Sequence, residues 1–424
     1  MRSTTNTMAA HVRVDSTMKA LAPIMVVVLV AYLIIGLAMP VLPLYVSKEL
    51  GLSTFLVGLA AGVEFAAALV SRFWSGRYAD TKGAKRAVIV GLLMGAVAGL
   101  LYLVSLGFAT RPVAAIIILL AGRVFLGGAE SFVITGALSW GLALGGARNT
   151  GKVIAWIGTA LWAAYAAGAP AGTALYGRYG FVAIALATML LPLVTLAAVV
   201  PLRSMPATAE SSPSIRRVLA AVSIPGLGVA LTAVGFGTIT TFGALLFAAH
   251  GWGMAWVAFT VLSVAFILGR VFFGHLPDTM GGARVALVCV LIETVGLALI
   301  WLAPSPSVVF AGAAITGVGY SLVYPGFGLE AIRRAPPEAK GLAMGAFTAF
   351  MDLSLGIANP ALGLIADHAG LRSVFLVSTV VVLGAAIVAA QLLRAGAPAG
   401  AESRPLRAND QHQPARRTVS RRAS

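Results

Sequence analysis

The most constraining feature of the sequence is a series of twelve long apolar segments. A transmembrane helix needs roughly 20 apolar residues to cross a bilayer. We predict spans at residues 21–46, 53–75, 87–107, 113–140, 153–177, 181–202, 218–247, 253–276, 285–303, 307–329, 341–366 and 373–393. Of the 424 residues, 59% are hydrophobic and only 10% are charged. Because soluble domains carry about 25% charged residues, the composition argues against a soluble protein and for an all-α integral membrane protein.

The positive charges are sorted along the chain. Lys and Arg number 30 against 14 Asp and Glu, giving a formal net charge of +16. If the N-terminus is cytoplasmic, 23 of the 30 basic residues fall in cytoplasmic segments, and the outer loops hold only Lys48, Arg111, Arg178 and Arg372. This bias follows the positive-inside rule. It predicts a multi-pass protein of a bacterial-type inner membrane with both termini cytoplasmic, and it accounts for the charge without a nucleic-acid partner.

Polar segments divide the chain into regions. Residues 1–20 are expected to form a cytoplasmic N-terminal segment, 203–217 a cytoplasmic linker and 395–424 a disordered basic cytoplasmic tail. Between them lie two predicted six-helix halves, 21–202 and 218–394.

The two halves carry an internal repeat. Gly76, Asp80 and Gly83 correspond to Gly274, Asp278 and Gly281 at an offset of 198 residues. Pro170 and Gly180 correspond to Pro360 and Gly370 at an offset of 190. Repeats in the same order predict two parallel six-helix halves that rock against each other around a site near the membrane midplane.

Four segments carry a resemblance to a known family. Residues 76–86 resemble motif A of the major facilitator superfamily (MFS), and 123–127 are similar to its motif B. Pro40 and Pro43 resemble the Pro-x-x-Pro element of proton:drug antiporters, and residues 168–172 resemble motif C, with Ala169 in place of the usual glycine. The chain most resembles the bacterial arabinose-efflux-permease-like and proton:drug antiporter-like twelve-helix group. The resemblance implies the MFS fold and proton-coupled export of a small organic solute, such as a sugar or drug-like compound, by alternating access. A proton symporter importing a sugar or organic acid is the alternative.

The segment at residues 76–86 is interpreted as a gating motif. Gly83 allows a turn with positive φ, and Gly76 allows close packing of helices. Asp80 lies where it could accept hydrogen bonds from a helix N-terminus of the other half or pair with a basic residue. An ordinary polar turn is the alternative. The predicted gating set is Gly76, Asp80, Gly83, Lys85, Arg86, Gly274, Asp278 and Gly281.

Charges inside the spans are the candidates for proton coupling, because charges in a membrane are costly and usually face a cavity or a partner. They are Glu64, Arg72, Arg123, Glu130, Arg270, Glu293 and Asp352. Arg123 and Glu130 lie seven residues apart and therefore share a helical face. The motif B resemblance implies a coupling role for Arg123. Because a low dielectric favours the neutral form of a carboxylate, Glu64, Glu130 and Asp352 are the predicted proton carriers; structural ion pairs are the alternative.

Prolines and small residues mark predicted bending points. Proline removes a backbone hydrogen bond, and neighbouring small residues permit close interhelical contact. The predicted positions are Pro40, Pro43, Gly168, Pro170, Gly172 and Pro360. Aromatic residues could line a cavity or simply pack the helices; they are Trp140, Trp156, Trp162, Tyr165, Phe236, Tyr320 and Tyr324.

Other functional classes find little support. Residues 146–152 match the start of a P-loop, but Val153 replaces the required Ser or Thr. No metal-ligand spacing is present, and Cys289 is a lone cysteine. We therefore expect neither an enzyme nor a non-transporting receptor, and no cofactor beyond a proton gradient. The expected partners are the lipid bilayer, protons and a small-molecule substrate, bound by a monomer.

Overall fold

The computed structural model describes residues 21–145, 150–202, 204, 215–336 and 339–395. The predicted N-terminal segment, all of the tail beyond Ala395, and most of the linker lie outside these residues. Within them, twelve helical spans are long and apolar enough to cross a membrane, which is the predicted number.

The first span, Leu21–Glu49, is broken near its end. Its main helix covers residues 21–38 and is followed by α2 (Leu42–Leu44) and the π-helix η1 (Tyr45–Glu49). The other spans are α3 (Thr54–Lys82), α4 (Ala84–Leu106), α5 (Pro112–Gly145), α6 (Thr150–Tyr179), α7 (Phe181–Val199), α8 (Ile215–Ala249), α9 (Ala255–Phe273), α11 (Gly282–Leu302), α12 (Pro306–Arg334), α13 (Lys340–Ala369) and α14 (Leu371–Ala395). A short helix, α10 (Leu276–Met280), precedes α11.

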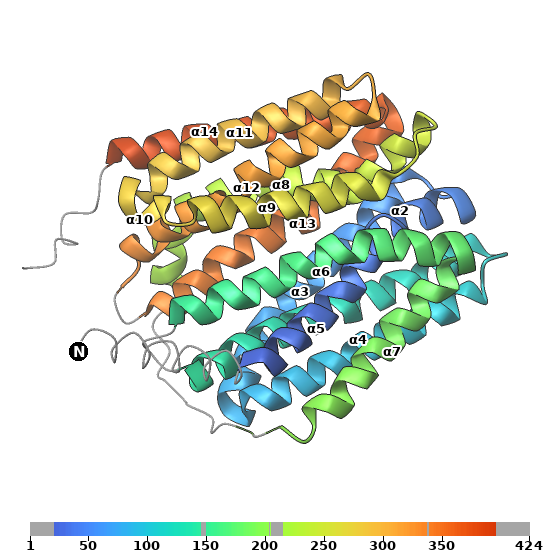
Figure 1. Cartoon of the computed structure of the whole chain (residues 1–424), viewed down its shortest axis with the longest axis horizontal. Helices are drawn as coiled ribbons and strands as arrows, with labels where there is room; N and C mark the ends of the chain where they lie inside the picture. Colours follow the sequence, from blue (N-terminus) through green and yellow to red (C-terminus); the bar gives the residue numbers. More distant parts are fainter. Residues whose placement is uncertain (1–20, 146–149, 203, 205–214, 337–338, 396–424) are drawn as a thin grey trace, which may run out of the picture.

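The helices form two bundles that lie side by side (Figure 1). The first bundle contains the helices up to α7, and the second contains α8 to α14; we call them the N-half and the C-half. Successive spans run in opposite directions, so the first helix begins and α14 ends at the same end of the molecule (Figure 1). We call this the terminal end, and we call the opposite end, where Glu49 and Thr54 lie, the far end.

The repeat seen in the sequence has matching backbone turns. Gly83 between α3 and α4 has φ +97°, and Gly281 between α10 and α11 has φ +89°. Gly180 between α6 and α7 and Gly370 between α13 and α14 have φ +69° and +84°. Glycine adopts these conformations without the steric penalty that a Cβ would bring. The same sharp reversals are thus built at corresponding places in the two halves.

The largest difference from the predicted helix boundaries is at the end of α3. Helix α3 continues seven residues beyond the predicted end at 75, to Lys82. The added residues are mostly polar and contain one glycine, Gly76, but no proline, so the helix outlasts the apolar stretch and ends only at the positive-φ Gly83. Gly76 and Asp80 consequently lie on the last turns of a helix instead of in a loop.

The two halves meet along two seams, α3 against α13 and α6 against α9. Towards the far end the first seam is tight: a Cβ at Gly62 would lie 2.8 Å from both the Gly356 carbonyl oxygen and Pro360 Cδ. Towards the terminal end it is loose: a Cβ at Gly76, Gly341 or Gly345 would meet nothing within 4 Å. The described contacts therefore close this seam from the far end to the middle and leave space beside its terminal end.

Candidate functional site

An ion pair joins the two halves in the middle of the α3–α13 seam. Arg72 Nη2 lies 2.6 Å and Arg72 Nε 2.7 Å from the same oxygen, Oδ2 of Asp352. The Asp352 side chain is 1% exposed and that of Arg72 is 19% exposed. The other salt bridges among the described residues lie within one half. Charge neutralisation at Asp352 would therefore act directly on the contact between the halves.

A second buried ion pair lies inside the N-half. Arg123 of α5 donates to the carboxylate of Glu64 on α3 and, from Nε, to the Ala60 carbonyl oxygen at 2.8 Å. A hydrogen bond of 3.4 Å joins its Nη1 to the Tyr102 hydroxyl. Both charged side chains are buried. The sequence placed Arg123 on one face with Glu130, but the salt bridge that the structure forms crosses to α3.

Glycine at position 127 explains this choice of partner. A Cβ at Gly127 would overlap the carbonyl oxygen of Glu64, so α5 and α3 are in backbone contact at this level. Such close approach is what small residues permit between membrane helices. The short interhelical distance brings the Glu64 carboxylate within reach of Arg123.

Glu130 lies apart from both ion pairs. Its carboxylate accepts a hydrogen bond of 3.3 Å from the Tyr32 hydroxyl of the first helix. It also lines a small cavity, about 10 Å³, between the first helix, α4, α5 and α7. That volume holds at most about one water molecule.

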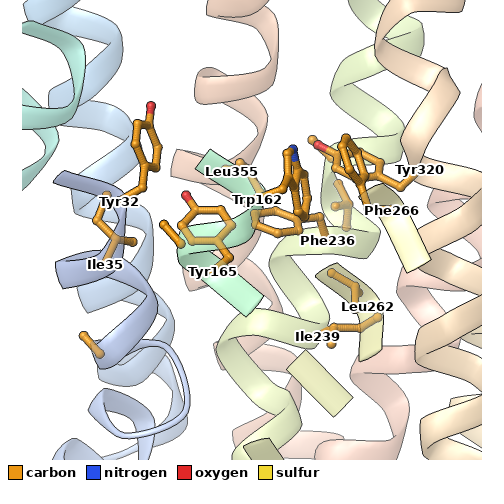
Figure 2. Packing of buried hydrophobic residues seen from close by; sticks show 14 of the residues in the cluster. Tyr32, Ile35, Trp162, Tyr165, Phe236, Ile239, Leu262, Phe266, Tyr320 and Leu355 are labelled. Atoms are coloured by element: carbon orange, nitrogen blue, oxygen red, sulfur yellow. The ribbon is translucent and has the colours of Figure 1, made fainter. Parts of the chain in front are cut away.

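Aromatic side chains fill the centre of the molecule between the halves (Figure 2). Trp162 of α6 stacks on Phe266 of α9 with ring centroids 3.6 Å apart, and Phe236 stacks on Tyr320 at 5.6 Å. Tyr165 bridges this cluster to Tyr32, with centroids 5.7 Å apart. Four of the aromatic residues predicted to line a cavity meet here: Trp162, Tyr165, Phe236 and Tyr320. The other three do not. The Tyr324 hydroxyl forms a hydrogen bond with Thr348, Trp156 is exposed and Trp140 is buried elsewhere.

The predicted gating residues lie at the terminal end. Asp80 and Arg86 are exposed on either side of the Gly83 turn, and Asp278 is exposed on α10. Lys85 has a specific contact: its Nζ donates to the carbonyl oxygens of Val200 and Leu202, each at 2.6 Å. These carbonyls lie at the C-terminal end of α7, where a cation also complements the helix dipole. Lys85 thus ties α4 to α7 within the N-half.

The predicted bending residues have two different positions. Pro40 lies in the turn between the main first helix and α2, and Pro43 lies within α2 itself. Pro170 and Pro360 lie inside continuous helices, α6 and α13. Gly168 and Gly172 pack α6 directly on the first helix, because a Cβ at either one would overlap the backbone of Gly36 or Leu37.

Asp367 at the far end was not singled out from the sequence. It lies on the last turn of α13, in the C-half, and caps the N-terminus of α3, in the N-half. Its Oδ1 accepts from Thr54 N at 2.8 Å, its Oδ2 accepts from Phe55 N at 3.0 Å, and the Thr54 hydroxyl also donates to it. The sequence offered one signal: Asp367 lies one residue beyond the predicted span 341–366, and the span that it contacts, 53–75, begins with Ser53-Thr54.

The sequence matches a known protein family along nearly all of the described chain. The model of the Major Facilitator Superfamily matches residues 24–257 and 226–423. The chain belongs to the major facilitator superfamily. The chain is 43% identical over 358 residues to an uncharacterized MFS-type transporter of Salmonella typhimurium, covering 84% of this chain and 92% of that protein. It is 42% identical over 356 residues to one of Burkholderia pseudomallei, covering 83% and 86%.

Solved structures of MFS proteins share the fold of this MFS chain. The nucleoside transporter NupG superposes with a TM-score of 0.70 at 13% identity, covering 88% of this chain and 99% of that one. A bacterial homologue of the human lysosomal transporter Spinster, in an inward-facing and occupied conformation, gives 0.69 at 15% identity, covering 89% and 96%. At such identities the likeness concerns the fold.

Glu293 is a buried carboxylate outside the ion pairs described above. Glu293 of α11 is fully buried, and neither of its carboxylate oxygens has a hydrogen-bond partner among the described residues. No group of three or more His, Cys, Asp or Glu side chains in the described ranges could hold a metal ion.

Proposed function

We propose that this MFS transporter is a proton-coupled exporter of a small organic solute, working by alternating access in a bacterial inner membrane with the terminal end in the cytoplasm. Membership of the superfamily makes it a membrane transporter. Proton coupling, the direction of transport and the class of substrate are the proposed parts.

The observation that carries the proposal is the Arg72–Asp352 ion pair between the halves. Removing one charge of a largely buried pair leaves the other uncompensated, at a cost of about 3–5 kcal/mol. A proton on Asp352 has the same effect as removing its charge. Protonation of Asp352 and separation of α3 from α13 are therefore thermodynamically linked.

The cycle follows from this linkage. In the conformation described, the seam is closed at the far end and has space at the terminal end, so the expected midplane site would be reached from the cytoplasm. Substrate entering from the cytoplasm competes with the Arg72–Asp352 pair and allows the far end to open. Asp352 then binds a proton from the outside as substrate leaves. After the halves return, the proton is released to the cytoplasm and the ion pair re-forms.

Roles for the other carboxylates differ. Glu64 is held by Arg123 inside one half and stabilises the packing of α3 on α5. Glu130 is the second proton candidate, since its hydrogen-bond partner is the neutral Tyr32 hydroxyl and it forms no salt bridge to an arginine among the described residues. Lys85 holds α4 to the end of α7 within the N-half, and the rest of the gating motif would latch the cytoplasmic side against the other half. Export, rather than import, is supported by the resemblance of residues 168–172 to motif C.

Cellular accumulation measurements test the proposal. Cells that overproduce the protein and cells that lack it are exposed to a panel of labelled organic acids, amines and neutral sugars, with and without an uncoupler. An exporter lowers the accumulation of its substrate, and the uncoupler restores it; an importer does the opposite. Asp352→Asn should abolish the gradient-dependent part, whereas Arg394→Gln, an exposed control at the end of α14, should leave it unchanged. Asp278→Asn separately tests the gating prediction. Transport unaffected by the uncoupler would overturn proton coupling.

A further inference from the structure

A cavity lies between α6 and α9, towards the terminal end. It has a volume of about 160 Å³ and is lined by Gly158, Thr159, Trp162, Phe266, Arg270 and Val271, among others. Trp162 and Phe266 belong to the aromatic cluster between the halves (Figure 2), so the cavity adjoins the central site.

Arg270 is the charged group of this cavity. Its guanidinium lies over the Phe266 ring, 5.4 Å from the centroid, and points back along α9. A Cβ at Gly158 would be 3.5 Å from its Nη1, so α6 lies directly beside it. Among the described residues, no carboxylate lies within salt-bridge distance of Arg270.

The internal repeat shows how the surroundings of Arg270 differ from those of Arg72. The offset of 198 relates Arg72 to Arg270, and the offset of 190 relates Asp352 to Trp162. Equivalent packing supports the alignment. A Cβ at Gly127 would overlap the Glu64 carbonyl oxygen, and a Cβ at Gly317 would overlap the Leu262 carbonyl oxygen. The offset of 190 relates the two glycines, and the offset of 198 relates Glu64 to Leu262. The α3–α13 seam thus pairs an arginine with a carboxylate, whereas in the α6–α9 seam the equivalent arginine and tryptophan line one cavity.

We propose that this cavity binds an aromatic carboxylate, with Arg270 supplying the counter-charge that the chain itself does not. An arginine fork matches a carboxylate through two parallel hydrogen bonds. The stacked Trp162 and Phe266 rings provide the apolar surface on which the aromatic body of the ligand lies. This inference deepens the proposed function by naming the substrate class of the α6–α9 side of the central site.

Equilibrium binding to the purified protein tests the inference without a gradient. Labelled 1-naphthoate is dialysed against the protein in nanodiscs of phosphatidylcholine, where no anionic lipid headgroup competes. Unlabelled 1-naphthamide and 1-naphthylmethylammonium are the competitors of matched shape. We expect the amide and the amine to compete at least about tenfold less well than naphthoate, because each lacks the charge that Arg270 pairs with.

Two variants and a control locate the charge. Arg270→Gln should weaken naphthoate binding about 10- to 100-fold and remove the preference over the amide, whereas Arg270→Lys should keep part of that preference. Arg394→Gln, at the exposed terminal end of α14, should bind as the unaltered protein does. Equal binding of acid and amide, undiminished binding to Arg270→Gln, or no binding of naphthoate at millimolar concentration would each overturn the inference.

The outcome is separable from that of the proposed function. Naphthoate binding that depends on Arg270, together with transport insensitive to an uncoupler, would leave this site standing and remove proton coupling. Gradient-driven transport of another class of solute, with no selective binding of naphthoate, would do the reverse.

Discussion

Replacing Asp367 with alanine should open the far end of the transporter. This residue accepts hydrogen bonds from Thr54 N, Phe55 N and the Thr54 hydroxyl, across the boundary between the two halves. All three bonds exist only while α13 lies against α3. Their loss therefore destabilises the conformation that is closed at the far end and leaves the open one unchanged.

The magnitude follows from the geometry of a helix cap. Loss of a side-chain cap at a helix N-terminus costs about 0.5–2 kcal/mol. Because Asp367 is exposed and its charge is screened by water and salt, we adopt about 1–2 kcal/mol instead of summing three charged hydrogen bonds. That energy corresponds to a shift of about 5- to 30-fold in the equilibrium between the two conformations. A far-end-open state populated at about 1% would rise to roughly 5–25%.

Spin-label distances measure this shift. The buried Cys289 is replaced by serine, and labels are attached to cysteines at Lys48 in the N-half and Met254 in the C-half, both exposed at the far end. Asp367→Ala should enlarge the long-distance population. The matched control is Glu49→Gln, which weakens the hydrogen bond donated by the Tyr176 hydroxyl at the same end but within one half. A distance distribution unchanged in Asp367→Ala, or changed equally in Glu49→Gln, would refute the reasoning.

Three further predictions concern packing and stability. Glu64→Leu leaves Arg123 buried without its counter-charge and should destabilise the fold by about 3–5 kcal/mol, seen as a lower melting temperature in detergent, with partial recovery in the double variant that also carries Arg123→Met. Gly62→Ala places a methyl against Pro360 and should favour the far-end-open state in the spin-label assay, whereas Gly345→Ala, beside open space, should not. Lys85→Met removes two hydrogen bonds to the end of α7 and should cost about 1 kcal/mol of thermal stability; an unchanged melting temperature would contradict a capping role.

The sequence predicted the number and order of the spans because length and hydrophobicity alone decide which segments cross a bilayer. Helix ends were predicted less well wherever a helix continues past the apolar region, as α3 does to Lys82. The repeat was also readable, since Gly83 and Gly281 are required by the same positive-φ turn.

Contacts between helices could not be predicted in the same way. Periodicity placed Arg123 and Glu130 on one face of α5, but the salt bridge to Glu64 depends on how closely Gly127 lets α3 approach. Arg72 and Asp352 were each recognised as charges within spans, but they are 280 residues apart in the sequence. Their pairing depends on the depth and the rotation of α3 and α13 in the membrane. Single-helix patterns carry no information on either quantity.

The most direct test of the central claim is a pH titration of the spin-label distance between Lys48 and Met254. Lowering the pH should raise the far-end-open population, because protonated Asp352 no longer holds Arg72. Asp352→Asn should show this raised population at every pH, with a weaker dependence on pH than the unaltered protein. An Asp352→Asn variant that keeps the full pH-dependent change would contradict the claim that Asp352 couples protons to the movement of the two halves.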